Sequence, residues 1–295
     1  RDNMQLDPTA YSILIRGNGV ARGTVPSGRL LALRPGDDAP SLPGIEVRDP
    51  AFGLPAVWIQ DRDRERASAA GYAVVDASTA LATHLAETIR SHAAELLGHQ
   101  QVRQLLDQMA ERSPKLVEDV VPTIVPVSVL HRTLRALLSE RVSIRDLGAI
   151  LETLAEHAPK QQDPEALTDA VRTRLARSIV QPHLEPDGTL HVMTLDPSLE
   201  ERLRSNLQRA ESGSILALDA PTIGSLYKGV ENALVNAQAP DRRKGPVLLC
   251  GASVRSALRQ LVARSAPQLP VVSYGELPPD ARIVGDAIVS LPDAH

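Results

Sequence analysis

Three histidines near one another in the sequence have residue types that could support metal chemistry. His84, His92 and His99 are separated by eight and seven residues. On one helix they would lie near one face, but neighbouring members would be about 11 Å apart at a rise of 1.5 Å per residue. Ligands of one metal ion bind at roughly 2 Å, so these imidazoles cannot share an ion. We therefore expect no metal site and interpret the histidines as solvated or groove-facing residues.

Two glycine-containing segments could in principle cradle an anion. Gly17, Gly19 and Gly23 lack the G-x-G-x-x-G spacing of a phosphate loop, and no Lys-Ser/Thr pair follows them, so we interpret them as turn glycines. Gly251 and Ser253 follow an apolar run and open a predicted helix, whose free N–H groups would attract an anion. A tight strand-to-helix turn explains Gly251 more simply. An anion- or nucleotide-binding α/β enzyme remains the alternative function.

The remaining reactive residue types form no catalytic pattern. The serines, histidines and aspartates lack a nucleophile-elbow motif. Cys250 lies inside an apolar run, which is typical of an inert core thiol. Acidic residues in the stretch 61–66 alternate with arginines, which indicates a solvated surface with local ion pairs. We therefore expect a protein that is not an enzyme and that needs no cofactor.

The composition limits the possible partners. The chain has 295 residues, enough for two to four small domains, and 43% are hydrophobic. Only 2% are aromatic, which argues against base-stacking surfaces. The 32 basic and 36 acidic residues give a net charge of −4, so we expect no nucleic-acid partner. The 23 prolines suit several small units joined by hinges, and such units commonly form binding scaffolds.

The cellular setting can be predicted in part. One cysteine cannot form an internal disulfide, which fits a reducing cytoplasm. No run of 18 apolar residues is present, so we expect a soluble fragment. The first methionine is Met4, and we therefore expect the natural chain to begin upstream of Arg1.

The elements that must position these residues change in character along the chain. The first part predicts short strands and a charged exposed helix at 61–70. A long helix follows, capped by Ser78 and ended by Gly98, with an apolar stripe that includes Leu81, Leu85, Ile89, His92 and Leu96 at helical spacing. Residues 128–180 predict a compact helical unit. The segment Ser143-Ile-Arg-Asp146 resembles a capping sequence before Leu147, and Asp163 with Pro164 starts the next helix.

The last part alternates between strands and helices. Apolar runs at 190–195, 246–250, 271–274 and 283–289 predict strands. Helices are predicted after the first two, at about 196–208 and 252–264. Residues 211–214 look like a linker. This order predicts parallel pairing, and the fold class of the whole chain is α/β in the mixed α+β sense.

An ordered set of motifs resembles one family. The motifs are Ile-Arg-Gly at 15–17, Phe-Gly-Leu-Pro-Ala-Val-Trp-Ile at 52–59, Gly-Tyr-Ala-Val-Val-Asp at 71–76, Pro-Lys-Leu-Val-Glu-Asp-Val-Val-Pro at 114–122 and Ile-Leu-Glu-Thr-Leu-Ala-Glu-His-Ala-Pro at 150–159. Together they resemble the cytoplasmic half of the type III secretion export-gate family, in its flagellar branch. The resemblance spans about residues 1–180 and is looser at 246–278.

The resemblance implies four small subdomains, the second inserted in the first, the third all-helical and the fourth a small α/β domain. We place subdomain 1 at 1–66 and 117–136, subdomain 2 at 67–116, subdomain 3 at 137–213 and subdomain 4 at 214–295. It also implies an N-terminal membrane half that is missing here, so this fragment would lie at the cytoplasmic face of the bacterial inner membrane.

The function that the resemblance implies is protein export during flagellum assembly. Family members form a nine-membered ring beneath the secretion channel, and they bind export chaperone–substrate complexes and other export-apparatus proteins, including the ATPase complex. The chaperone groove would involve His92, Pro114 and Thr123, with Ile89 and Leu96 nearby. The family often has an aromatic residue where this chain has the smaller His92.

Two other interpretations stay open. From the residues alone, the stripe with Ile89 and Leu96 could be ordinary core. A purely structural ring component, which leaves cargo to other proteins, is a further alternative.

Overall fold

The computed structural model describes residues 6–36, 38–210, 213–237 and 242–291. The first methionine, Met4, and residues 211–212 of the expected linker lie outside these ranges. The chain divides into two compact units, Arg1–Leu96 and Leu97–His295, and each is described by itself. The boundaries of the four expected subdomains stay a prediction. Within the described residues, no helix is long and apolar enough to cross a bilayer.

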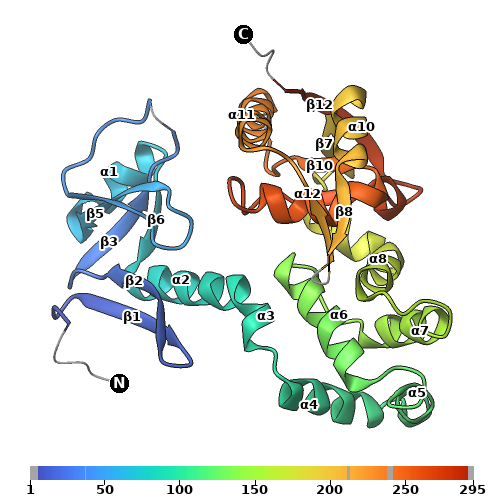
Figure 1. Ribbon diagram of the computed structural model, residues 1–295. Helices are drawn as coiled ribbons and strands as arrows, with labels where there is room; N and C mark the ends of the chain where they lie inside the picture. The colour runs from blue at the N-terminus through green and yellow to red at the C-terminus, as the bar shows by residue number, and fades with distance from the viewer. Residues whose placement is uncertain (1–5, 37, 211–212, 238–241, 292–295) are drawn as a thin grey trace. The chain divides into compact units, whose positions relative to one another are not determined.

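The first unit is built around a four-stranded antiparallel sheet in the order β4-β5-β3-β6 (Figure 1). A separate hairpin pairs β1 with β2. The strands are β1 (Ala10–Ile15), β2 (Asn18–Thr24), β3 (Arg29–Leu33), β4 (Ile45–Arg48), β5 (Pro55–Gln60) and β6 (Ala73–Asp76). The helices are the 3-10 turn η1 (Asp61–Asp63), α1 (Arg64–Ala69), α2 (Ala77–Ser91) and α3 (Ala93–Leu96).

Both faces of this sheet are covered by apolar clusters. Alternate residues of a strand point to opposite sides, so one strand contributes to both clusters. On β3, Leu30 and Ala32 pack in a cluster with Ala67 of α1. Leu31 of the same strand packs on the other face with Ala80 of α2. The sheet therefore holds α1 and α2 through two separate apolar clusters.

The second unit begins with a helical layer. Its helices are α4 (His99–Ala110), α5 (Pro114–Val120), α6 (Val127–Ser139), α7 (Leu147–His157), α8 (Pro164–Arg174), α9 (Ala176–Val180) and the 3-10 turn η2 (Gln181–His183). Asp146 caps α7 by accepting the Ala149 N–H at 3.1 Å, and Asp163 caps α8 through the Glu165 N–H at 3.2 Å. The helix starts predicted at these two aspartates are confirmed.

A parallel sheet in the order β11-β10-β7-β12 completes the second unit (Figure 1). Its elements are β7 (Thr189–Leu195), α10 (Pro197–Ser205), α11 (Ala220–Asn236), β10 (Val247–Cys250), α12 (Ala252–Val262), β11 (Val271–Ser273), the 3-10 turn η3 (Tyr274–Glu276) and β12 (Arg282–Val289). On β10, Val247 and Leu249 pack in the core with the helical layer, and Leu248 and Cys250 pack with α10–α12. The predicted parallel pairing and the mixed α/β class are confirmed.

Two predicted elements differ from the structure. The helix expected to run on to Gly98 ends at Ser91, because the His92 carbonyl accepts the N–H groups of Glu95 and Leu96 and starts the new turn α3. Gly98 instead precedes α4 as its N-cap. The helix expected to reach residue 208 stops at Ser205, since the next residues pair as a hairpin, β8 (Leu207–Ala210) with β9 (Gly213–Leu216).

Candidate functional site

Three of the five predicted groove residues, Ile89, His92 and Leu96, lie in helix α2 or in the segment that follows it. The start of α2 is fixed by Asp76. The Asp76 carboxylate accepts the Thr79 N–H at 2.6 Å and the Ser78 hydroxyl at 2.7 Å. These hydrogen bonds, from Ser78 first and then Thr79, lower the pKa of Asp76 to about 2. Asp76, not the expected Ser78, is therefore the N-cap, because its carboxylate reaches the free N–H of the first turn.

The buried face of α2 is polar. His84, Glu87 and Thr88 are buried there beside Ala80. The Tyr11 hydroxyl and His84 Nδ1 lie 2.6 Å apart, and the Thr88 hydroxyl donates to the His84 carbonyl at 2.8 Å. Burial lowers the pKa of His84, because the charged imidazolium loses hydration. A neutral, hydrogen-bonded His84 therefore fixes α2 against β1.

The exposed side of α2 contains a row of apolar residues. Leu81, Leu85 and Ile89 are 38%, 44% and 48% exposed, and they stand four residues apart. Side chains at i and i+4 are neighbours on one helix face, so the three form a continuous stripe. A surface helix normally shows polar residues to water and buries apolar ones. The reversed pattern on α2 marks this stripe, which we call the α2 stripe, as a surface suited to a partner.

His92 and Leu96 extend this surface at the end of α2. His92 is half-buried, and its Nδ1 lies 3.2 Å from Glu95 Oε2. Leu96, at the end of α3, is 38% exposed. Arg16 donates to the Glu95 carbonyl at 3.0 Å and ties α3 to the β1–β2 turn. Ile89, His92 and Leu96 are therefore grouped on one stretch of the first unit.

The other two predicted groove residues lie in the second unit. Pro114 is the first residue of α5, and Thr123 follows α5 after the cis Val121–Pro122 peptide bond. Both are exposed. The neighbouring Ile124 is 39% exposed although it is apolar. None of the five predicted residues is buried in a core. Their assignment to one groove stays a prediction.

Sequence reasoning did not assign three exposed apolar residues to the site. Leu81 and Leu85 were placed on the helix but not on its surface, and Ile124 was not singled out. The available signal was the spacing of Leu81 and Leu85 with Ile89, opposite the polar residues of the same helix. That signal becomes informative only when the buried face is known.

The histidines do not form a metal-binding group. His84 bonds to Tyr11, and His92 lies beside Glu95. His99 packs its ring on His131, with ring centroids 4.2 Å apart, and His131 bonds to the Leu97 carbonyl. Within the described ranges, no group of three potential ligands is arranged to hold an ion.

The turn at Gly251 already binds a carboxylate of the same chain. Its N–H donates to Glu200 Oε1 at 3.0 Å, at the start of α12 where an external anion would sit. A Cβ at position 251 would lie 2.5 Å from this oxygen, so a side chain there would require the Glu200 carboxylate to move. The segment is therefore a strand-to-helix turn closed by Glu200. Just before it, burial raises the pKa of the Cys250 thiol to about 12.

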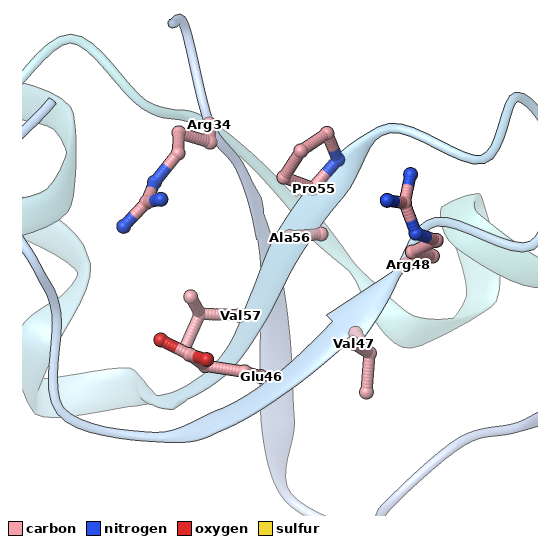
Figure 2. A pocket seen from close by; sticks show the side chains of 7 residues that line it. All are labelled: Arg34, Glu46, Val47, Arg48, Pro55, Ala56 and Val57. Atoms are coloured by element: carbon pink, nitrogen blue, oxygen red, sulfur yellow. The ribbon is translucent and has the colours of Figure 1, made fainter. Parts of the chain in front are cut away.

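A pocket of about 370 Å³ lies on the sheet of the first unit, and Figure 2 shows its side chains. It is lined by Arg34, Glu46, Val47, Arg48, Pro55, Ala56 and Val57. Arg48 donates to the Gly53 carbonyl at 2.9 Å, and Arg34 donates to the Tyr72 hydroxyl at 3.3 Å. Both guanidinium groups thus hold segments of the chain itself, and the pocket shows no catalytic arrangement.

The sequence and the fold of this chain are both similar to those of known proteins. The model of the FHIPEP family matches residues 1–282. The flagellar biosynthesis protein FlhA of Escherichia coli strain K12 is 45% identical over 280 residues, which cover 94% of this chain and 39% of that protein. The chain thus spans about two-fifths of the length of this relative.

Two solved structures share the fold. The Chlamydia pneumoniae CdsV and CdsO protein complex gives a TM-score of 0.86 at 28% identity, covering 98% of this chain and 83% of that chain. The nonameric EscV cytosolic domain from the type III secretion system gives 0.75 at 23% identity, covering 96% and 83%. The predicted resemblance to the export-gate family is confirmed. The chain belongs to the FHIPEP family.

Proposed function

We propose that this chain is the cytoplasmic part of a flagellar protein export gate, which docks export chaperone–cargo complexes and passes the cargo to a membrane channel. Membership of the FHIPEP family and the relationship to FlhA support the export-gate role. The observation that carries the docking role is the α2 stripe, whose apolar residues face outward while His84, Glu87 and Thr88 face inward. The proposed cellular location of the chain is the cytoplasmic face of the bacterial inner membrane.

The size of the α2 stripe suggests reversible binding. Fully burying a Leu or Ile side chain contributes roughly 1.5–3 kcal/mol. Leu81, Leu85 and Ile89 are already about half buried, so covering the rest yields roughly 3 kcal/mol in total. Association costs on the order of 4–15 kcal/mol. The stripe alone is therefore too weak, and we include His92 and Leu96 of the same unit in the docking surface. Pro114 and Thr123 of the second unit stay members of the predicted groove on the resemblance alone.

The partner would supply a helix, or a segment that folds on binding, with its own apolar face. Helices commonly bind apolar grooves through their own residues spaced at i, i+3, i+4 and i+7. The α2 stripe would face such a helix with apolar residues at 81, 85 and 89. A segment that orders on binding loses conformational entropy and therefore binds with lower affinity for its area. Such an interface suits a step that must release its cargo again.

Ring assembly and binding of other export-apparatus proteins are proposed from the relatives of this chain. The EscV domain is nonameric and CdsV was solved with CdsO, and we extend both properties to this chain as a ring and a second class of partner. The ATPase complex is included among those export-apparatus partners. We propose that the chain itself is not an enzyme and that export is energised elsewhere. The alternative anion-binding enzyme loses support because Glu200 occupies the Gly251 N–H.

An export assay in the source bacterium tests the proposed function. Ile89→Asp is introduced into the chromosomal gene, and flagellar proteins secreted into the medium are quantified. We expect at least a tenfold loss, because a carboxylate on the stripe would be desolvated by the partner. Val235→Asp is the matched control, since Val235 is an exposed apolar residue of helix α11. Normal secretion by Ile89→Asp, with equal protein levels, would favour a purely structural ring component.

A further inference from the structure

A second surface in the second unit has the features of a binding site. A cavity of about 280 Å³ lies where the ends of the helical layer meet the loop 267–270 between α12 and β11. The lining residues that matter for binding are Glu140, Arg172, Pro182, Arg259, Leu269 and Pro270. Pockets for drug-sized ligands usually measure about 300–1,000 Å³. This cavity lies just below that range.

Glu140 is the one carboxylate among these lining residues, and it is already engaged. Its Oε2 accepts Arg172 Nη1 at 3.0 Å and Arg255 Nη1 at 2.8 Å. Arg172 is satisfied further by Glu276 Oε1 at 2.6 Å, and Arg255 by Asp169 Oδ1 at 2.9 Å. This buried network leaves no carboxylate of the cavity wall free for a further cation.

Arg259 is a cavity residue with donors that the chain itself does not use. Its guanidinium donates to the Leu269 carbonyl at 3.3 Å and to the Pro267 carbonyl at 3.0 Å. A guanidinium has five N–H donors, so three remain. Within the described residues it forms no ion pair, and none of its nitrogens is both buried and unpaired. These donors are therefore open to the cavity or to water.

The positive charge of the cavity persists at neutral pH. Burial, and then the positive charge of Lys244, lower the pKa of His183, so this imidazole is neutral at pH 7. The charge comes from arginines, which stay protonated. Burial lowers the pKa of Arg259, the Glu140 carboxylate opposes this shift, and the nearby Arg141, Arg172 and Arg255 lower the pKa further. An added carboxylate would relieve this repulsion.

We propose that this cavity binds the side-chain carboxylate of an acidic segment of a partner protein. The carboxylate would accept hydrogen bonds from the free N–H groups of Arg259, an arrangement that is frequently bidentate. Its methylene stem would pack on Pro182, Leu269 and Pro270. Prolines offer no N–H, so the wall gives little of the backbone cradle that a phosphate requires. This site is separate from the α2 stripe and does not depend on the docking role proposed for it.

Methyl NMR on the 295-residue chain tests the proposal. The probes are N-acetyl-glutamate amide and its neutral isostere N-acetyl-glutamine amide, and inorganic phosphate is titrated separately. The reporters are the methyl groups of Ile179, Leu269 and Val271, which line the cavity. We expect saturable shifts with the glutamate compound and at least tenfold weaker effects with the glutamine compound. Arg259→Gln should weaken glutamate binding at least tenfold.

Arg264→Gln is the matched control, because Arg264 is an exposed arginine just beyond α12. It should leave the shifts unchanged. If Arg259→Gln alters the methyl spectrum without ligand, Arg259→Lys replaces it as the test variant. Arg259→Lys keeps the positive charge but loses the planar guanidinium fork, so it should lower the affinity for the glutamate compound. Equal responses to both amides, no saturable shift, or full binding by the Arg259 variants would overturn the proposal. Saturation by phosphate without a glutamate response would indicate an inorganic-anion site and would overturn it as well.

Discussion

At the scale of single residues, Cys250 shows how the environment sets chemistry. It lies in β10 among core residues, and burial raises the pKa of its thiol to about 12. The thiolate, which is the nucleophile, is therefore scarce at neutral pH. Its position inside an apolar run allowed this inertness to be predicted from the sequence.

We expect Cys250 to be unreactive toward a disulfide reagent at pH 8 and to react at once in 6 M guanidinium chloride. The pKa is raised, so the folded chain keeps its proton at pH 9–12 while the unfolded chain loses it. Stability should consequently fall as the pH rises through this window. Rapid labelling of the folded chain would contradict the burial of Cys250.

Asp76 gives a second prediction, of opposite sign. Its pKa is lowered to about 2 by the cap hydrogen bonds, from an unfolded value of about 3.9. The stability that it contributes is therefore present above pH 4 and lost as the pH falls toward 2. We expect urea unfolding of wild type and Asp76→Asn to differ at pH 6 and to converge as the pH falls below 4. A difference that is independent of pH would contradict the ionised cap.

At the scale of elements, the starts of helices could be predicted from neighbouring residues, whereas features that depend on distant residues could not. Asp146 and Asp163 allowed the starts of α7 and α8 to be predicted, because capping uses neighbouring N–H groups. The hairpin β8–β9 was missed since residues up to 208 look helical and its pairing depends on tertiary contacts. The end of α2 at Ser91 was missed for the same reason.

The ion pairs of the second unit allow buried and exposed charges to be compared. Arg172 on α8 pairs with Glu276 of η3, 104 residues away, and both are buried. Arg177 on α9 pairs with Asp280 at 3.1 Å, and both are exposed. Such distant pairs leave no pattern in the sequence.

We expect Arg172→Ala to lower the free energy of unfolding by about 3–5 kcal/mol, because it removes both guanidinium hydrogen bonds to the buried Glu276 carboxylate and leaves Arg255 Nε, 3.6 Å away, as its remaining cation. Arg177→Ala should change it by about 0–1 kcal/mol, since water and salt screen an exposed pair. Urea unfolding followed by circular dichroism measures both. Similar effects of the two substitutions would contradict the burial of the network.

At the scale of the whole molecule, the sequence predicted the class of the fold and the family, while the surface needed coordinates. The alternation of apolar runs with helices was sufficient to predict the parallel sheet. Whether Ile89 was core or surface could not be decided from its spacing, because a helical stripe has the same period in both cases. The exposure of Leu81, Leu85 and Ile89 supports the surface interpretation. The assignment of Pro114 and Thr123 to the chaperone groove stays a prediction.

The central claim is that the α2 stripe docks export chaperone–cargo complexes, and calorimetry tests it most directly. A purified cognate flagellar chaperone–cargo complex is titrated into the wild-type chain, Ile89→Asp, Thr123→Asp and the Val235→Asp control. The account predicts saturable binding that Val235→Asp retains and that both site variants weaken at least tenfold. Wild-type affinity of Ile89→Asp, with the chain folded, would contradict it.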